Sequence, residues 1–235
     1  MNIKTKFYDN YISNKQATIS TKTNFFYEKL VKKLSASHSK SSSVLDLGCG
    51  NGEFLSYFNK FGFQDLLGVD ISKEMIENSV EGVESYLVHS DIFVFLANNN
   101  KKFDIIILKD ILEHFTLTEG VKLIQLVEGI LNPNGVLFIH VPNAEGINSN
   151  SVFYGDITHE IFYSKRLIES VLILASFKFK NIHFLEDFPH TRSFFGISRY
   201  ILYLIFTFPR RVLYLAESGT FSLLCSQNIS CFIYK

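Results

Sequence analysis

Cysteine is scarce in this sequence, and its few positions argue against two common classes of protein. Three cysteines occur in 235 residues, at positions 49, 225 and 231. They are odd in number and lack the spacing of metal ligands, which argues against a disulfide-stapled secreted protein and against a zinc module. Asp110 with Asp91 or Asn143 is too weak a set to indicate magnesium. We therefore expect reduced thiols, a cytoplasmic location and no metal site.

A net charge and a long apolar run are also missing. Lysine plus arginine and aspartate plus glutamate number 23 each, so nothing indicates a nucleic-acid partner. The longest charge-free run in the apolar segment 194–216 is Tyr200–Phe208, far short of the roughly 20 residues that a membrane span requires. Residues 1–11 are polar and carry no apolar signal region. Hydrophobic residues still make up 47% of the chain, which is enough for one domain with a substantial core.

The most informative stretch of the sequence is residues 44–54. Val44–Leu47 reads as a short buried strand, after which glycines stand at positions 48, 50 and 52 and helical spacing resumes at Phe54. A strand that turns into a helix through glycines brings backbone close to a ligand. Asp46, just before the glycines, would repel a phosphate and attract an ammonium group. The pattern therefore favours a cationic, phosphate-free ligand.

This stretch resembles the first motif of class I S-adenosylmethionine-dependent methyltransferases, whose D-x-G-x-G-x-G loop wraps the methionyl part of the cofactor. Asp70 lies about one βα unit further on, where a carboxylate takes the ribose hydroxyls, although an aspartate after a strand can also be only a helix cap. Asp91 matches the position that meets the adenine amino group. The resemblance implies S-adenosylmethionine as cofactor, bound by Asp46, Gly48, Cys49, Gly50, Gly52, Asp70, Ile71, Ser72, Met75, Asp91, Ile92 and Lys109.

Apolar runs and helical periods alternate along the chain and predict an α/β fold. The expected strands are residues 44–47, 66–70, 86–92, 103–108, 136–141, 181–185 and 228–234, and Ser72, Thr118 and Ser164 are expected helix caps. The resemblance implies a Rossmann-like, doubly wound seven-stranded sheet with its last strand antiparallel and helices on both faces. We expect a single domain, divided into an N-terminal helical cap (1–43), a cofactor-binding half (44–143) and an acceptor-binding half (144–235).

The catalytic candidates are histidines near the expected ligand edge. His159 ends a long polar loop, residues 144–160, and we expect it to be the general base, oriented by Asp156 or Glu160. His114, in the segment Asp110–Phe115 that is similar to the family's D-x-L-E-H segment, and His140 are the competing bases. A structural role remains the alternative: Glu113 and His114 could tie their loop to its neighbours, and His159 could link its loop to the following helix.

The acceptor is suggested only by a looser resemblance. Val141–Asn143, the loop after it, Gly155–Glu160 and Glu217–Gly219 are similar to methyltransferases of bacterial surface-polysaccharide biosynthesis. That implies O-methylation of a sugar or a small polar group. The residues expected to bind this acceptor are Tyr11, Asp110, His140, Asn143, Tyr154 and Glu160.

Alternatives remain open for the acceptor and for the apolar segment. The acceptor could instead be a prenylated phenol or another lipid-like molecule, or the chain could be a non-catalytic cofactor-binding module. Segment 194–216 is strongly apolar and is interrupted by three arginines and Pro209. We expect it to form one or two helices that serve as a lid, a homodimer surface or a peripheral membrane contact.

Overall fold

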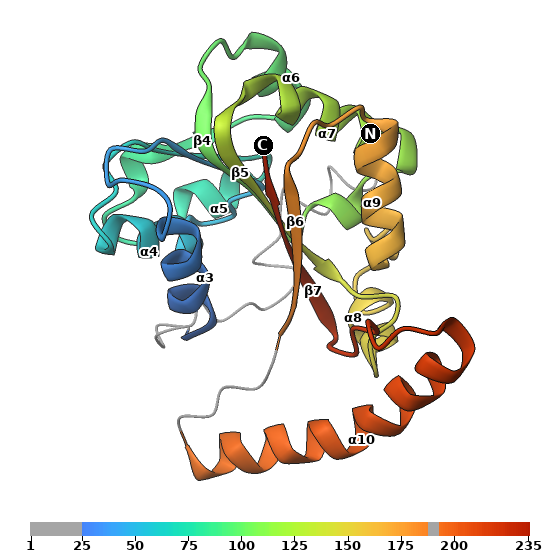
Figure 1. Cartoon of the computed structure of the whole chain (residues 1–235). Helices are drawn as coiled ribbons and strands as arrows, with labels where there is room; N and C mark the ends of the chain where they lie inside the picture. The colour runs from blue at the N-terminus through green and yellow to red at the C-terminus, as the bar shows by residue number, and fades with distance from the viewer. Residues whose placement is uncertain (1–24, 188–192) are drawn as a thin grey trace.

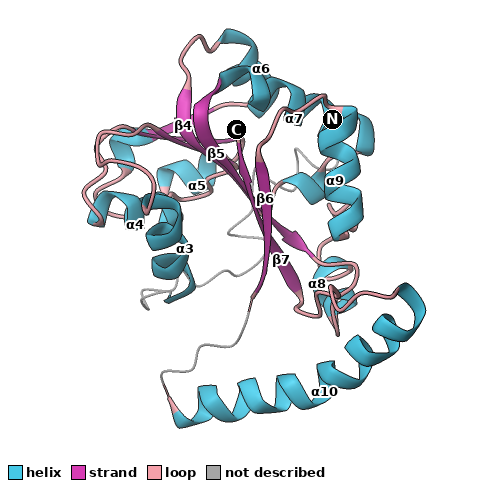
Figure 2. Cartoon of the chain, in the orientation of Figure 1, coloured by secondary structure: helices cyan, strands magenta, loops and turns pink. Residues whose placement is uncertain are grey.

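A seven-stranded sheet lies at the centre of the computed structural model, which describes residues 25–187 and 193–235 (Figure 1, Figure 2). Its strands are β1 (Val44–Leu47), β2 (Leu66–Asp70), β3 (Leu87–His89), β4 (Phe103–Lys109), β5 (Leu131–Pro142), β6 (Asn181–Glu186) and β7 (Asn228–Tyr234). They lie in the order β3-β2-β1-β4-β5-β7-β6, and β7 runs antiparallel to both of its neighbours. The expected Rossmann-like sheet with an antiparallel last strand is confirmed.

The helices cover both faces of this sheet because the central strands are apolar on both faces. Ile106 and Leu108 of β4 pack on the side of α6, α7 and α9, whereas Ile105 and Ile107 pack on the side of α3 and α4. Side chains of a strand alternate between faces, so a continuous apolar run is what a sheet covered twice requires. The helices are α3 (Phe25–Ser35), α4 (Glu53–Lys60), α5 (Lys73–Glu77), α6 (Ile92–Asn98), α7 (Leu117–Ile130), α8 (Ser149–Phe153), α9 (Lys165–Leu174) and α10 (Phe194–Ser218).

Several element boundaries differ from those expected. Helix α7 is capped by Thr116, not Thr118, because Glu119 at the third helical position returns a hydrogen bond and completes a capping box. Strand β3 ends at His89 instead of continuing to residue 92. Asp91 begins α6 instead, and its Oδ1 accepts from the backbone N–H groups of Phe93 and Val94, at 2.8 and 3.0 Å.

Strand β5 also begins earlier than expected, since it includes the turn at residues 131–135. The polar loop expected over residues 144–160 contains the short helix α8. The apolar segment forms one helix, α10, which continues through Pro209.

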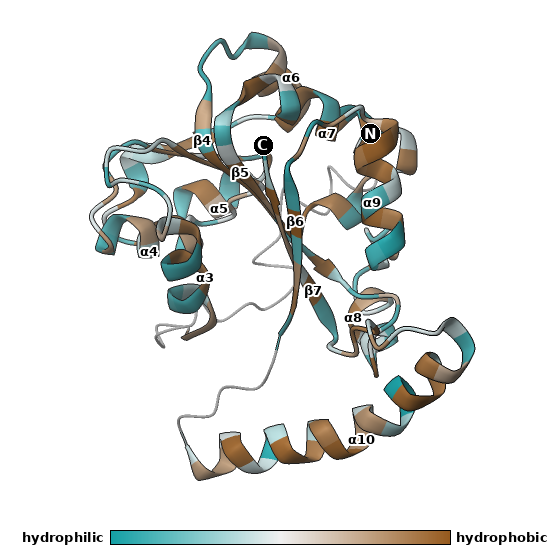
Figure 3. Cartoon of the chain, viewed as in Figure 1, coloured by the Kyte–Doolittle hydropathy of each residue, from teal (hydrophilic) through white to brown (hydrophobic). Residues whose placement is uncertain are grey.

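Helix α10 turns its polar side toward the protein and its apolar side outward. Gly196 and Thr207 are buried, and Tyr203 and Arg211 bind the carboxylate of Glu186 at the end of β6, at 2.7 and 2.5 Å. Figure 3 shows apolar colour along much of the helix, which runs past one end of the sheet. Its exposed apolar side chains are Phe194, Phe195, Ile197, Ile201, Leu202, Leu204, Ile205, Phe206, Phe208, Val212, Leu213 and Leu215. Among the described helices, none combines the length and apolarity needed to cross a membrane.

Candidate functional site

The glycine turn after β1 has a geometry that only glycine adopts without strain. Gly48, Gly50 and Gly52 have φ values of +81°, +56° and +79°. A Cβ at Gly48 would lie 2.8 Å from Ile111, and one at Gly50 would lie 2.9 Å from Cε of Met75. The turn therefore presents bare backbone at the carboxyl edge of the parallel strands, where ligands of open α/β sheets bind.

Asp46 places an unsatisfied carboxylate beneath this turn. The side chain is 2% exposed, and its Oδ1 has no hydrogen-bond partner among the described residues. Burial raises the pKa of Asp46 to about 7, although the nearby Lys109 ammonium lowers it. A buried carboxylate without a donor is costly, and a cationic ligand would compensate that cost.

Asp70 holds the same turn from the end of β2. Its Oδ2 accepts from the backbone N–H of Gly50 at 2.7 Å, and its Oδ1 accepts from that of Ser72 at 2.8 Å. Burial raises the pKa of Asp70, while these two hydrogen bonds lower it. Ser72 caps α5 as expected, accepting from the N–H of Met75 at 3.3 Å. The carboxylate thus joins the glycine turn to the start of α5.

The other residues expected around the cofactor lie on the glycine turn or on the neighbouring βα connections, and they differ in polarity and in hydrogen bonding. Cys49 is a buried thiol whose pKa is raised by burial. Ile71 accepts a hydrogen bond from His89 through its carbonyl group, at 3.0 Å. Ile92 is buried at the start of α6, directly after Asp91. Asp91 lies on the adjacent βα connection, with its Oδ1 engaged in capping that helix.

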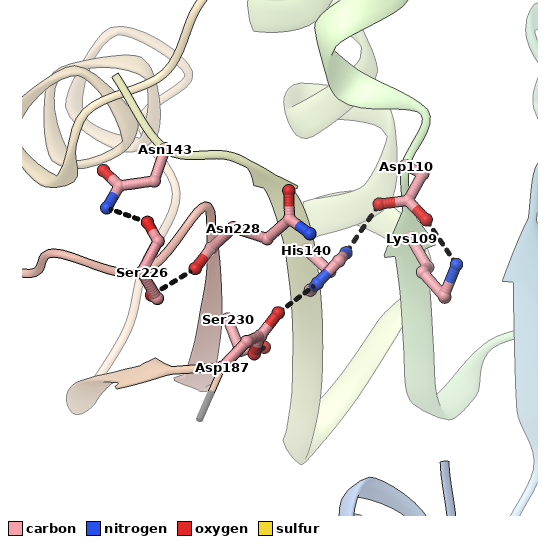
Figure 4. A network of polar contacts seen from close by, with 8 residues as sticks. All are labelled: Lys109, Asp110, His140, Asn143, Asp187, Ser226, Asn228 and Ser230. Carbon is pink, nitrogen blue, oxygen red and sulfur yellow. Dashed lines mark hydrogen bonds and ion pairs between the residues drawn. The ribbon is translucent and has the colours of Figure 1, made fainter. Parts of the chain in front are cut away.

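A chain of charges crosses the sheet edge from β4 to β6 (Figure 4). Lys109 pairs with Asp110, whose Oδ1 lies 2.6 Å from Nδ1 of His140. Nε2 of His140 lies 2.7 Å from Asp187, and Ser230 donates to the other oxygen of Asp187 at 3.1 Å. Both ring nitrogens of His140 therefore face carboxylates.

This arrangement favours the charged form of His140. Burial disfavours its charge, but the carboxylates of Asp110 and Asp187 raise its pKa to about 10. Burial raises the pKa of Asp110, yet Lys109 and His140 together hold it well below its usual range. Asp110 has a φ of +53°, a strained backbone that this ion-paired network holds in place. A histidine that is protonated at neutral pH is a poor general base.

Helix α3 covers this network with aromatic rings that the sequence did not single out. The ring centroid of Phe26 lies 5.5 Å from that of His140. The ammonium of Lys109 lies 5.4 Å from the ring centroid of Tyr27, which also contacts Phe54. The only signal in the sequence was the apolar periodicity of residues 25–34. Asp187, which follows β6, had no signal at all.

A second cluster contains the candidate bases. Ring centroids of His114 and His159 lie 4.7 Å apart, and Nε2 of His159 lies 4.0 Å from Oε1 of Glu113. Nδ1 of His159 lies 2.6 Å from the carbonyl oxygen of Phe153. Glu113 is 1% exposed, and burial, with the nearby charge of Asp110, raises its pKa to about 8. The expected base therefore faces a glutamate for which the sequence suggested a structural role.

The expected orienting carboxylate, Asp156, reaches a different histidine. Its Oδ1 accepts from Oγ1 of Thr158 at 2.6 Å, and the same Oγ1 lies 2.8 Å from Nδ1 of His114. Glu160 is instead tied through its backbone, which donates to the carbonyl oxygen of Glu113 at 2.8 Å. His159 is positioned by the Phe153 carbonyl group. The structure thus brings His114, Asp156 and His159 together, with a pairing that spacing could not reveal.

The residues expected to bind an acceptor are dispersed. Asn143 is fully buried, donating to the carbonyl groups of Leu224 and Ser226 and accepting from the N–H of Glu145. Tyr154 is 77% exposed. Tyr11 lies outside the described residues. Asp110 and His140 are part of the charged network.

A cavity of about 880 Å³ opens beside this network, between α10 and the sheet edge. Leu202, Tyr203 and Phe206 of α10 line one side, and Asn148, Asp187 and Asn228 lie among its other lining residues. Asp187 also binds His140, so the cavity reaches the charged network. Its walls therefore offer both apolar area and hydrogen-bonding groups.

Comparison with known proteins identifies the family. A family model described as a methyltransferase domain matches residues 21–192, well over half of the chain. The chain belongs to this methyltransferase family. A crystal structure of an S-adenosylmethionine-dependent methyltransferase from Archaeoglobus fulgidus is similar, with a TM-score of 0.66, 20% identity and coverage of 97% of this chain and 100% of that one. Magnesium protoporphyrin IX methyltransferase from Synechocystis PCC 6803, crystallised with S-adenosylhomocysteine, has a TM-score of 0.62 at 14% identity and covers 99% and 98%.

A curated relative matches this methyltransferase over a shorter segment. The small RNA 2'-O-methyltransferase of Schizosaccharomyces pombe is 30% identical over an alignment of 123 residues, and the match covers 44% of this chain and 32% of that protein. The first three curated relatives are each matched over less than half of their own length. The comparisons therefore establish the family and the fold and do not identify an acceptor.

The residues of this chain fit S-adenosylmethionine, the cofactor that the resemblance implies. Asp46 offers an orphaned buried carboxylate to a cation, and at each of the three glycines an added Cβ would lie within 3.0 Å of a neighbouring side chain. Asp70 stands at the end of the neighbouring strand, where the ribose of a bound nucleoside can reach a carboxylate. These residues match a ligand that carries positive charge and a ribose but no phosphate.

Proposed function

We propose that this methyltransferase O-methylates a sugar or another small polar acceptor used in cell-surface glycan biosynthesis. The observation that carries the proposal is the cluster of Glu113, His114 and His159 beside the segment that packs on the glycine turn. A hydroxyl group must lose its proton to become an effective nucleophile, so an acid–base cluster is expected for O-methylation. The resemblance of Val141–Asn143 and Gly155–Glu160 to surface-polysaccharide methyltransferases supports the acceptor class.

The chain supplies positioning and a route for the proton. S-adenosylmethionine, when bound, supplies an activated methyl group on a sulfonium. Asp46, the glycine turn and Asp70 hold and orient it, and α3 limits access of water through Phe26 and Tyr27. Because Nδ1 of His159 lies 2.6 Å from a carbonyl oxygen, Nδ1 carries the hydrogen and Nε2 is the basic atom. Nε2 is then available to accept the proton from an acceptor hydroxyl.

The cavity between α10 and the sheet edge would hold the part of the acceptor that lies away from the reacting hydroxyl, since neither His159 nor Glu113 is among its lining residues. Its volume of about 880 Å³ lies in the range of small-molecule sites. We infer a division in which residues 44–143 bind the cofactor and residues 144–235, including α10, bind the acceptor, under the helical cap of residues 1–43. The balanced charge gives no support to a nucleic-acid acceptor. Three buried free thiols support a reducing, cytoplasmic location.

The experiment that tests this function is a labelling assay. The purified protein is incubated with S-adenosylmethionine labelled in its methyl group and with fractionated cell-surface precursors. We expect label in a carbohydrate-containing fraction, in an ether bond that resists mild base. Label confined to protein, RNA or lipid fractions would contradict the proposed acceptor.

His159→Gln is expected to lower turnover by about 10²–10⁴-fold, because it removes the basic atom while keeping similar size and polarity. Affinity for S-adenosylmethionine should change little, since His159 does not contact the glycine turn. Steady-state rates with the labelled acceptor and calorimetric titration of the cofactor measure the two effects.

Variants of the two competing histidines are compared with His159→Gln in the same assays. His140→Gln should affect stability more than turnover, because His140 is held as an imidazolium between two carboxylates. A loss below about threefold in His159→Gln, together with inactivity of His140→Gln or His114→Gln, would place the base elsewhere.

A lipid-like acceptor is a second candidate, and the outward apolar side of α10 favours it. Eight of the exposed apolar side chains lie within residues 201–208 and 212–213, and two of them, Leu202 and Phe206, line the cavity. The charged residues of segment 194–216 are three arginines. Arg211 is paired with Glu186, whereas Arg210 is exposed and suits an anionic lipid head group. A homodimer through the same segment would cover the same side chains.

Co-sedimentation separates these possibilities. Binding to vesicles that contain anionic lipid, lost in an Ile205→Glu/Leu213→Glu variant, would support a membrane-borne acceptor. A concentration-dependent dimer in light scattering, lost in the same variant without vesicle binding, would support the dimer. Thermal unfolding should be unchanged in that variant, because both side chains are exposed.

A further inference from the structure

We propose that Glu113, His114 and His159 form a binding site for a divalent transition-metal ion such as Zn²⁺. The role suggested below for this ion rests on the proposed O-methylation, whereas binding of the ion does not. The three residues come from the turn η2 (Leu112–His114) and from the loop after α8. One ligand atom from each lies within 4.8 Å of the other two. Two imidazoles and a carboxylate are a common ligand set for zinc and related ions.

Glu113 supplies the first argument, because its carboxylate is buried and incompletely satisfied. The residue is 1% exposed, and its Oε2 has no hydrogen-bond partner among the described residues. Its backbone carbonyl oxygen is engaged by the N–H groups of Glu160 and Ile161, at 2.8 and 3.2 Å. These contacts fix the turn and leave the carboxylate facing the histidines. A bound cation would compensate the cost of burying this group.

His159 supplies the second argument through its tautomer. Nδ1 must donate to the carbonyl oxygen of Phe153, which lies 2.6 Å away. Nε2 therefore carries a lone pair in the neutral ring, and it lies 4.0 Å from Oε1 of Glu113. Two electron-pair donors that face each other repel unless a cation lies between them. Two ligands of a tetrahedral ion lie about 3.4 Å apart when each bond is roughly 2.1 Å, so a shift of about half an ångström would bring both atoms within reach of one ion.

His114 is oriented by groups that do not belong to the site itself. The carboxylate of Asp156 only accepts hydrogen bonds, so Oγ1 of Thr158 must donate to it, at 2.6 Å. The same hydroxyl must then accept from Nδ1–H of His114, at 2.8 Å. Nε2 of His114 consequently carries the lone pair. A histidine ligand whose other nitrogen donates to a hydrogen-bonded group is typical of metal sites.

Three protein ligands leave coordination positions for other molecules. An acceptor hydroxyl that binds the ion would have a lower pKa, so that it loses its proton to solvent and its oxygen attacks the methyl carbon. The carbon–sulfur bond then breaks and its electron pair stays on sulfur, which becomes neutral. In this arrangement His159 acts as a ligand and the ion promotes deprotonation. The spacing of the sequence gave no indication, because α7 and β5 separate the two histidines.

A proton on Glu113 or His159 would also relieve the repulsion, so the experiment must detect the ion directly. The full-length protein is treated with a chelator, desalted and titrated with zinc chloride in a calorimeter. We expect one ion per chain. Glu113→Gln and His159→Gln should weaken binding at least tenfold, whereas His183→Gln, which changes an exposed histidine of β6, should bind as the wild type does.

Cofactor titration and thermal unfolding establish that the variants are folded. Zinc binding to folded Glu113→Gln and His159→Gln with wild-type affinity would overturn the proposed site, and so would the absence of binding by the wild type. Full methyl transfer by chelator-treated protein that binds zinc would overturn the role of the ion. Zinc binding without labelling of any glycan precursor would refute the proposed acceptor and leave the metal site supported.

Discussion

Two aspartates at neighbouring strand ends have different partners and therefore different roles. Asp70 accepts two backbone hydrogen bonds and fixes the glycine turn, whereas Asp46 keeps an oxygen with no partner among the described residues. A satisfied carboxylate is a positioning group that can still accept further donors on its remaining lone pairs. An unsatisfied one is poised for a cation. The two carboxylates therefore differ in their capacity to bind a cofactor, because only Asp46 has an oxygen without a partner among the described residues.

Asp70→Ala should weaken binding of S-adenosylmethionine at least tenfold. The change removes charge-assisted hydrogen bonds, each worth about 1.5–3 kcal/mol, and also releases the N–H groups of Gly50 and Ser72. Calorimetry gives the affinity, and Asp65→Ala, which removes an exposed carboxylate paired with Lys101, is the matched control. Unchanged affinity in Asp70→Ala would reject its assignment to the ribose.

Cofactor affinity should fall as the pH is lowered from 7 to 5.5. Burial raises the pKa of Asp46 to about 7, so acidification through that value neutralises the carboxylate that attracts the cation. Asp46→Asn should bind more weakly at pH 7 and lose most of this pH dependence. Titrations of both proteins at several pH values measure the difference, and parallel pH profiles would contradict the role of Asp46.

Sequence spacing singled out candidate residues that lie close together in the sequence. It missed residues that come together only when distant elements pack against one another. Asp46, Asp70 and the glycines lie within two short segments, so their order along the chain was informative. Glu113 and Asp187 became relevant only through histidines from other elements, His159 and His140. Contacts of that kind depend on sheet order, which no spacing rule encodes.

At the scale of elements, the glycine turn is a connection in which any side chain larger than that of glycine strains the backbone. Gly50→Val should abolish cofactor binding, because a β-branched side chain strains a φ of +56° and would meet Cε of Met75. Gly129→Ala in α7 is the control, since a Cβ there meets nothing within 4 Å. Circular dichroism confirms folding, and calorimetry measures binding. Wild-type affinity in Gly50→Val would show that the turn does not cradle the cofactor.

The bounds of strands and helices were predictable where the sequence favoured one type of element. They were less predictable where the same residues suited two types. Strands β1, β2 and β7 lie at the expected residues because continuous apolar runs leave no alternative. The end of β3 was misplaced because Asp91 suits a strand end and a helix cap equally, and its carboxylate captured two helix N–H groups. Pro209 suggested a break in the apolar segment, but α10 continues through it.

At the scale of the molecule, His140 connects strands that are far apart in the sequence. It belongs to β5 and binds Asp110 after β4 and Asp187 after β6. Asp110 and Asp187 raise its pKa to about 10, well above its ordinary value. The folded state therefore keeps a proton that the unfolded chain has lost between about pH 6.5 and 10. This contribution to stability is complete at low pH and disappears across that window.

The free energy of unfolding should consequently fall as the pH rises from 7 to 9, by at most about 1.4 kcal/mol per pH unit from this group. Urea titrations at both pH values measure the change. His140→Gln should be less stable at pH 7 and should show a smaller change with pH. An equal change in the variant would mean that other groups carry the pH dependence.

The position of β7 has a consequence for the folding of the chain during its synthesis. Strands β1 to β5 pair with one another, whereas β6 pairs with β7 alone. Ribosomes add about 5–20 residues per second and release the earlier part of a chain first. The cofactor-binding strands can therefore assemble while β6 waits, with its edges unpaired, for a strand not yet made. A nascent chain halted before residue 228 should be a better target for chaperones than one halted before residue 181.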